Sequence, residues 1–330
     1  MRPGRVCFPA MAPDLTTRLG PLTLATPLVA ASGCYGYGTE YADLVRLDEF
    51  GAVVSKGISP EPRTGNPIPR LAETSGHGLL NSIGLQNPGI DGFLEDKWPQ
   101  IAASKVPVLI NVIGYTIADY VTVVERLEHL PVAGWELNVS CPNVDKGGIE
   151  IGAECTSVGE VTARCVAATS KPVIVKLSPN QGDPRPFAEV ALEAGAVALT
   201  IANTYLGMSV DIHRRTSRLG RDYGGLSGPG VKPITLRMVH QVYQSLGCPI
   251  IASGGIYKWE DAAEYLIVGA TALALGTVNF VDPFRVAAIK AGLSDYLDRL
   301  GLSLDELRGS YRSPAVAQVA LEQGLMSPAE

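Results

Sequence analysis

The hydrophobic positions of the chain fall into eight short runs, most of which end in a small or polar residue. The runs span residues 27–32, 52–56, 106–111, 135–139, 173–177, 197–203, 249–253 and 272–276. Amphipathic helical patterns lie between them, for example at 120–129, 158–168, 186–194 and 258–268. Continuous apolar strands that alternate with helices indicate parallel strands covered on both faces. Eight such units predict an α/β fold with a single closed (β/α)8 TIM barrel over about residues 27–285.

Four segments lie outside this alternation. Residues 15–25 are predicted to form an N-terminal hairpin that turns at Gly20–Pro21 and closes the floor of the barrel. Residues 57–105 and 204–231 form two unusually long connections, and the second is rich in glycine and arginine. Since long connections in compact domains usually serve function, we expect both to lie as loops over the carboxyl ends of the strands. About residues 286–325 are predicted to form C-terminal helices, so that residues 1–330 make one domain.

Composition and charge narrow the class of protein. The chain is 46% hydrophobic and 18% charged, which excludes a disordered protein. A net charge of −6 without a run of five like charges argues against a nucleic-acid or anionic membrane surface. The longest uncharged run, residues 19–39, is broken by Pro21 and Pro27 and cannot form a transmembrane helix. The N-terminus has no apolar core of signal-peptide length, so we expect a cytoplasmic protein.

The six cysteines are scattered and include no C-x-x-C pair. In a cytoplasmic chain this pattern indicates reduced thiols rather than disulfides, zinc ligands or an iron–sulfur cluster. They are Cys7, Cys34, Cys141, Cys155, Cys165 and Cys248. We expect one of them to be reactive and the others to be packing residues.

Polar residues end most of the predicted strands. The carboxyl ends of barrel strands face one pocket, so these side chains should converge there. The residues at these strand ends are Lys56, Asn111, Asn138, Lys176, Asn203 and Ser253, together with Gly276, which has no side chain. Asparagine carries a donor and an acceptor on one planar group, and several together suit a cyclic imide ring. The candidates for this role are Asn81, Asn138, Asn143 and Asn203, with turn capping as the alternative for Asn81 and Asn143.

Two lysines and two glycine-containing loops indicate anionic ligands. Lys176 lies in an otherwise apolar strand and needs an anionic or electron-rich partner, and Lys56 is the second candidate cation. Both suit a substrate carboxylate or a flavin whose reduced ring is negatively charged. Gly254–Gly255 follows the seventh predicted strand and Gly276–Thr277 follows the eighth. Loops at these two places form the recurrent phosphate site of barrels.

Cys141 is the candidate for acid–base chemistry. It lies just beyond the fourth predicted strand, in the segment Asn138-Val-Ser-Cys-Pro-Asn143. The histidines occupy other kinds of position, so a Cys–His hydrolase is poorly supported. A cysteine that acts as a proton acceptor needs no such partner.

These segments together resemble dihydroorotate dehydrogenase. The stretches that carry the resemblance follow the family's order over about residues 15–285: ASGCYGYGTEY, NSIGLQNPG, ELNVSCPNV, VKLSPN, GGLSGPGVKP, ASGGI and LGTVNF. The resemblance implies one FMN per chain, with Cys141 removing the C5 proton of dihydroorotate while hydride passes from C6 to the flavin, giving orotate. It assigns the substrate to Lys56, Asn81, Ser82, Ile83, Gly84, Leu85, Asn138, Asn143, Asn203 and Thr204. It assigns FMN to Ser32, Lys56, Gly57, Asn111, Asn138, Lys176, Ala202, Gly228, Gly254, Gly255, Gly276 and Thr277.

The cysteine base and the lack of an N-terminal membrane segment resemble class 1 of the family. ASGCYGYGTEY and GGLSGPGVKP are similar to the NAD-linked type B catalytic subunit. That resemblance implies a homodimer of this chain within a heterotetramer, whose partner subunit carries FAD and an iron–sulfur cluster. The chain itself shows neither a G-x-G-x-x-G unit after a predicted strand nor the cysteine spacing that a cluster requires.

Four alternatives remain at this point. The fumarate-linked type A enzyme shares the same pocket, and so does another FMN pyrimidine dehydrogenase, such as a dihydropyrimidine dehydrogenase domain. A flavin-free isomerase or aldolase-type barrel would use the same loops for a phosphorylated substrate. A non-catalytic scaffold would not need Cys141 together with Lys56 and Lys176.

Overall fold

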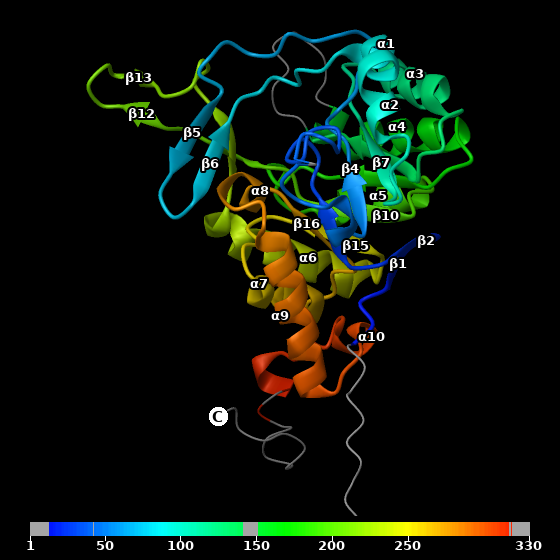
Figure 1. The fold of residues 1–330 in the computed structure, drawn as a ribbon, viewed down its shortest axis with the longest axis vertical. Helices are drawn as coiled ribbons and strands as arrows, with labels where there is room; N and C mark the ends of the chain where they lie inside the picture. The colour runs from blue at the N-terminus through cyan, green and yellow to red at the C-terminus, as the bar shows by residue number, and fades with distance from the viewer. Residues whose placement is uncertain (1–12, 42, 141–150, 317, 319–330) are drawn as a thin grey trace, which may run out of the picture.

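The computed structural model describes residues 13–41, 43–140, 151–316 and 318. Eight parallel strands close into a barrel in chain order, and the last strand pairs with the first (Figure 1). Each strand overlaps one of the predicted runs, so the predicted TIM barrel is confirmed. The strands are β3 (Leu28–Ala30), β4 (Ala52–Val54), β7 (Val108–Val112), β8 (Gly134–Asn138), β9 (Val173–Lys176), β10 (Ala198–Ile201), β15 (Ile250–Ser253) and β16 (Ala272–Leu275).

Helices cover the outside of the barrel. The amphipathic patterns become α3 (Ile117–Leu127), α4 (Cys155–Ala167), α5 (Arg185–Glu193) and α7 (Trp259–Ile267). The structure adds α6 (Lys232–Leu246), which ends at Gly247 in the left-handed conformation. The C-terminal segment contains α9 (Arg285–Leu300) and α10 (Leu304–Leu307). Shorter helical turns are η1 (Leu47–Glu49), α1 (Gly89–Gly92), η2 (Phe93–Lys97), α2 (Trp98–Ile101), η3 (Ile151–Ala153), η4 (Pro229–Val231) and α8 (Val278–Val281).

The N-terminal hairpin closes the barrel floor as predicted. β1 (Thr17–Leu19) and β2 (Leu22–Leu24) pair antiparallel around a turn in which Gly20 has a φ of +58°. Leu19 and Leu24 are fully buried in the cluster formed by the inward-facing residues of the barrel strands. The amino-terminal end of the barrel is therefore a packed apolar layer.

The two long connections form a second sheet together, which the sequence analysis treated only as loops. Its strands are β5 (Leu71–Thr74), β6 (Gly78–Asn81), β11 (Tyr205–Gly207) and β14 (Gly224–Ser227), in the antiparallel order β11-β14-β6-β5. A small hairpin of β12 (Val210–Asp211) and β13 (Thr216–Ser217) lies on the same side of the molecule (Figure 1). Among the residues described, no helix is long and apolar enough to cross a membrane.

Candidate functional site

The inward-facing residues change from apolar to polar along the barrel strands. On β7 and β9, buried Leu109 and Ile174 are followed two residues later by Asn111 and Lys176. Because side chains alternate along a strand, each polar residue lies above an apolar one on the inner face. The same change occurs on β15, where Ser253 follows Ile251. The floor is therefore apolar, and the polar groups collect at the carboxyl ends.

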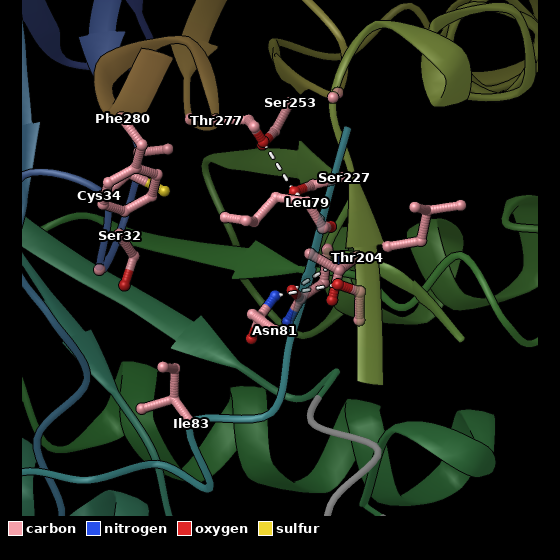
Figure 2. A pocket seen from close by; sticks show the side chains of 18 of the residues that line it. Ser32, Cys34, Leu79, Asn81, Ile83, Thr204, Ser227, Ser253, Thr277 and Phe280 are labelled. Carbon is pink, nitrogen blue, oxygen red and sulfur yellow. Dashed lines mark hydrogen bonds between the residues drawn. The ribbon is translucent and has the colours of Figure 1, made fainter. Parts of the chain in front are cut away.

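A pocket of about 380 Å³ lies at these carboxyl ends, between the barrel and the second sheet. Most of the predicted site residues line it: Ser32, Lys56, Gly57, Asn81, Ile83, Gly84, Leu85, Asn111, Asn138, Lys176, Ala202, Asn203, Thr204, Gly228, Gly254, Gly255, Gly276 and Thr277. Figure 2 shows side chains of this pocket drawn from both the barrel and the second sheet. Cys141 and Asn143 lie outside the described residues.

Ser82 is placed differently from its neighbours. Leu79, Asn81 and Ile83 line the pocket, as expected for alternate residues of an extended segment. Ser82 is fully buried on the opposite side, and its hydroxyl accepts a hydrogen bond from Asn66 Nδ2 at 2.9 Å. Its side chain therefore anchors the loop that contains Asn66.

Asparagine amides meet on one wall of the pocket. Asn138 Oδ1 accepts hydrogen bonds from Ser140 Oγ at 2.7 Å and from Asn203 Nδ2 at 3.2 Å. Asn81 lies at the end of β6, where its Nδ2 donates to the carbonyl oxygen of Gly225 at 3.1 Å. This bond fixes Asn81 across the second sheet, whereas the sequence had left turn capping open. The wall thus presents three fixed amide groups, from the first long connection, from β8 and from the residue that lies just after β10.

A buried charged cluster lies on the neighbouring strands. Lys176 is only 6% exposed, and its Nζ lies 3.8 Å from Oε1 of Glu136, which is 2% exposed. The carboxylate also accepts hydrogen bonds from Asn111 Nδ2 and Thr200 Oγ1, both at 2.7 Å. Sequence reasoning identified Lys176 but missed Glu136. The same sequence feature marks both residues, because each is a charged residue within an otherwise apolar strand.

Lys56 supplies a second cation at the end of β4. Burial lowers the pKa of its ammonium, the nearby Glu40 carboxylate opposes this, and Arg70 and Lys97 lower the pKa further. The free pocket therefore penalises the charged form of Lys56. An anionic ligand beside Lys56 would offset this penalty.

Glycines allow three loops to approach one another closely at one end of the pocket. These loops follow β14, β15 and β16. Gly255 has a φ of +73°, and an added Cβ would lie 2.8 Å from Lys232 Cβ and 2.9 Å from the Gly228 carbonyl oxygen. Thr277 Oγ1 donates to Ser227 Oγ at 2.7 Å, which joins the loop after β16 to β14 (Figure 2). The predicted phosphate loops therefore lie beside the end of β14, where only a residue without a side chain fits at position 255.

Cys34 also lines this pocket, although the sequence analysis did not assign it to the site. Burial raises the pKa of its thiol to about 11, and the charge of Lys176 opposes this shift. The thiol is therefore neutral at ordinary pH. His77 and Tyr257 stack at the pocket with ring centroids 5.4 Å apart, and neither was identified from the sequence as a site residue.

The chain is similar to known proteins over most of its length. The family model for dihydroorotate dehydrogenase matches residues 14–297. The catalytic subunit of dihydroorotate dehydrogenase B (NAD(+)) from Geotalea daltonii is 45% identical over 302 residues, covering 91% of this chain and 99% of the relative. The same subunit from Pelobacter propionicus is 45% identical over 294 residues, covering 89% and 96% of the two chains.

The fold has a solved counterpart. A crystal structure of DHODH in complex with ferulenol from Eimeria tenella superposes with a TM-score of 0.73 and 23% identity, covering 90% of this chain and 88% of that one. This likeness supports the barrel architecture alone. The family expected from the sequence is confirmed by the model match and the relatives. The chain belongs to the dihydroorotate dehydrogenase family and is similar to the catalytic subunits of its NAD-linked B type.

Proposed function

We propose that this chain oxidises dihydroorotate to orotate in the de novo synthesis of pyrimidine nucleotides, with one FMN bound per chain. The observation that carries the proposal is the convergence of three features in one pocket. These are the asparagine amides, the two lysines and the close-packed glycine loops. The amides match the pyrimidine ring, the lysines match the substrate carboxylate and the flavin ring, and the glycine loops match the FMN phosphate.

The pocket fits FMN. Gly228, Gly254, Gly255, Gly276 and Thr277 would hold the phosphate, because backbone N–H groups can approach it closely where no side chain intervenes. Asn111 Oδ1 is buried and has no hydrogen-bond partner within the described part of the chain, which leaves an acceptor for a ring N–H group. The remaining contacts are assigned to Ser32, Lys56, Gly57, Asn138, Lys176 and Ala202. When bound, FMN supplies the hydride acceptor.

The substrate would lie against the amide wall. Asn81, Asn138 and Asn203 present donors and acceptors that match the alternating N–H and C=O groups of a dihydropyrimidine ring. Lys56 would pair with its carboxylate, since an anion offsets the cost of its buried charge. The further substrate assignments are Ser82, Ile83, Gly84, Leu85, Asn143 and Thr204, of which Ser82 acts through the loop that it anchors.

Cys141 is the proposed base that takes the proton from C5. It directly follows Ser140 in the sequence, and Ser140 Oγ is hydrogen-bonded to Asn138 and Asn203. The residue before the base is therefore tied to two proposed substrate ligands.

Electrons are proposed to leave through a second subunit that carries FAD and an iron–sulfur cluster and reduces NAD. The supporting observation is that the relatives are themselves named catalytic subunits of an NAD-linked enzyme. Two copies of each chain would make a heterotetramer around a homodimer of this chain. The cytoplasmic location remains a prediction.

The test is spectroscopic. We expect the purified chain to be yellow, to bleach anaerobically with dihydroorotate, and to shift its flavin spectrum with orotate. A colourless protein that FMN does not restore would favour the flavin-free barrel. A yellow protein that responds to dihydrouracil but not to dihydroorotate would be another pyrimidine dehydrogenase.

A further inference from the structure

Glu136 lies in the middle of β8, two residues before Asn138, and faces into the barrel beneath the pocket. It is 2% exposed, and its carboxylate contacts Asn111 and Lys176, which both line the pocket. A buried charge of this kind is costly unless it is paired and hydrogen-bonded. The presence of Glu136 on β8 therefore has to be accounted for, whereas burial alone accounts for its apolar neighbours.

Both carboxylate oxygens of Glu136 have partners. Oε1 accepts from Asn111 Nδ2 at 2.7 Å and lies 3.8 Å from Lys176 Nζ, and Oε2 accepts from Thr200 Oγ1 at 2.7 Å. The cluster is thus built from one side chain on each of four consecutive strands, β7 to β10. Glu136 is the member that contacts the other three.

The barrel register fixes these contacts. Glu136 is paired with Asn111 across β7 and β8, and Thr200 is paired with Lys176 across β9 and β10. Side chains carried on adjacent strands of a closed barrel hold their separation better than side chains on loops. Buried ion pairs add little stability compared with apolar residues of the same size. Stability alone therefore does not explain a carboxylate here.

We propose that Glu136 is a positioning residue that holds the Lys176 ammonium and the Asn111 amide at the pocket wall, and so sets the redox potential of the bound flavin. This rests on the proposed function, since the flavin is the group that Lys176 would act on. Lys176 would stabilise the negative charge of the reduced ring only while its ammonium points at the pocket. Glu136 holds it there, because the carboxylate places a counter-charge 3.8 Å from Lys176 Nζ.

The test compares the flavin midpoint potential of the holoprotein at pH 7 in a double-mutant cycle. Glu136→Gln keeps the size and can keep the bonds to Asn111 and Thr200, but it removes the charge. We expect its potential to fall in the same direction as that of Lys176→Met, by a smaller amount. In the Lys176→Met background, Glu136→Gln should cause no further fall. A residue that acts by positioning Lys176 can no longer change the potential once the lysine is gone. A structural role of Glu136 would still change the potential in the Lys176→Met background.

Two further variants serve as controls. Glu128→Gln removes the carboxylate that pairs with Lys171 at 3.3 Å, at the opposite end of β9 from the pocket, and should leave the potential unchanged. Thr200→Val removes one hydrogen bond to Glu136 and keeps its charge, so a smaller fall is expected. If Glu136→Gln does not fold, Thr200→Val becomes the test variant. An unchanged midpoint potential in Thr200→Val then overturns the proposal.

An unchanged or raised potential in Glu136→Gln overturns the proposal. A rise would mean that the carboxylate acts only as a negative charge opposed to the reduced ring. These results differ from a failure of the proposed function, in which the unmodified chain binds no FMN. In that case the proposed role of Glu136 is refuted together with the proposed function.

Discussion

Asn203 Nδ2 lies 2.7 Å from Ser140 Oγ and donates a hydrogen bond to it. The two residues follow β10 and β8, which β9 separates in the barrel. Ser140 directly precedes Cys141 in the sequence, so this bond holds the residue before the proposed base against the proposed substrate wall.

Cys141→Ser should keep FMN and orotate binding but slow flavin reduction strongly at neutral pH. A serine hydroxyl is a much weaker acid than a thiol, so the anionic base becomes scarce. Stopped-flow reduction by dihydroorotate measures the effect, and its rate should recover partly as the pH rises. Near-normal reduction at pH 7 would remove Cys141 from the mechanism.

Asn203→Ala should weaken orotate binding about tenfold, which corresponds to about 1.4 kcal/mol for lost hydrogen bonds in a buried site. FMN should remain bound, because Asn203 is assigned to the substrate. Titration of the flavin spectrum with orotate gives the dissociation constant. Ser140→Ala is the companion variant, and a smaller effect is expected since it leaves the Asn203 amide in place. Equal affinities in Asn203→Ala and the unmodified protein would contradict this assignment.

Orotate binding should weaken toward alkaline pH because of Lys56. Burial lowers the pKa of its ammonium in the free pocket. The charged form that pairs with a carboxylate is therefore fully present below this lowered pKa and is lost as the pH rises through it. Affinity should then fall by up to about tenfold per pH unit, beginning below the ordinary range of a lysine. The dependence should disappear in Lys56→Met, and its persistence there would assign it to another group.

Gly255→Ala should lower FMN affinity by at least about tenfold. The left-handed conformation costs a side-chain residue about 1–2 kcal/mol, and the added Cβ would press on Lys232 and on the Gly228 carbonyl oxygen. Gly230→Ala is the matched control, since an added Cβ there meets nothing within 4 Å. Dissociation constants from flavin fluorescence compare the two. Similar losses in both variants would show that position 255 has no special role.

The isolated chain should reduce artificial dyes with dihydroorotate but hardly reduce NAD. Reduction of NAD should appear when the FAD- and cluster-bearing subunit is added in equimolar amount. Efficient NAD reduction by the single chain would refute the need for a partner. Efficient fumarate reduction would place the chain with the type A enzymes instead.

The sequence by itself determined the barrel and most of its site. Each strand is a local run of apolar residues, most of them with a polar residue at or near the end. Each phosphate loop is a local glycine pattern. Neither feature depends on distant parts of the chain. The (β/α)8 topology then brings all carboxyl ends together. For this reason the sequence alone assigns Lys56, Asn111, Lys176 and Gly255 to one pocket, and the structure places them there.

Only the tertiary structure decided how the two long connections pair. Asn81 and Gly225 are 144 residues apart and meet in an antiparallel ladder, yet the strands are only four residues long. Such short segments carry too little periodicity to specify a partner. The register of β6 also decided that Asn81 faces the pocket while Ser82 faces Asn66. The pairing of Glu136 with Lys176 was likewise hidden, because it depends on the alignment of neighbouring strands and not on spacing along the chain.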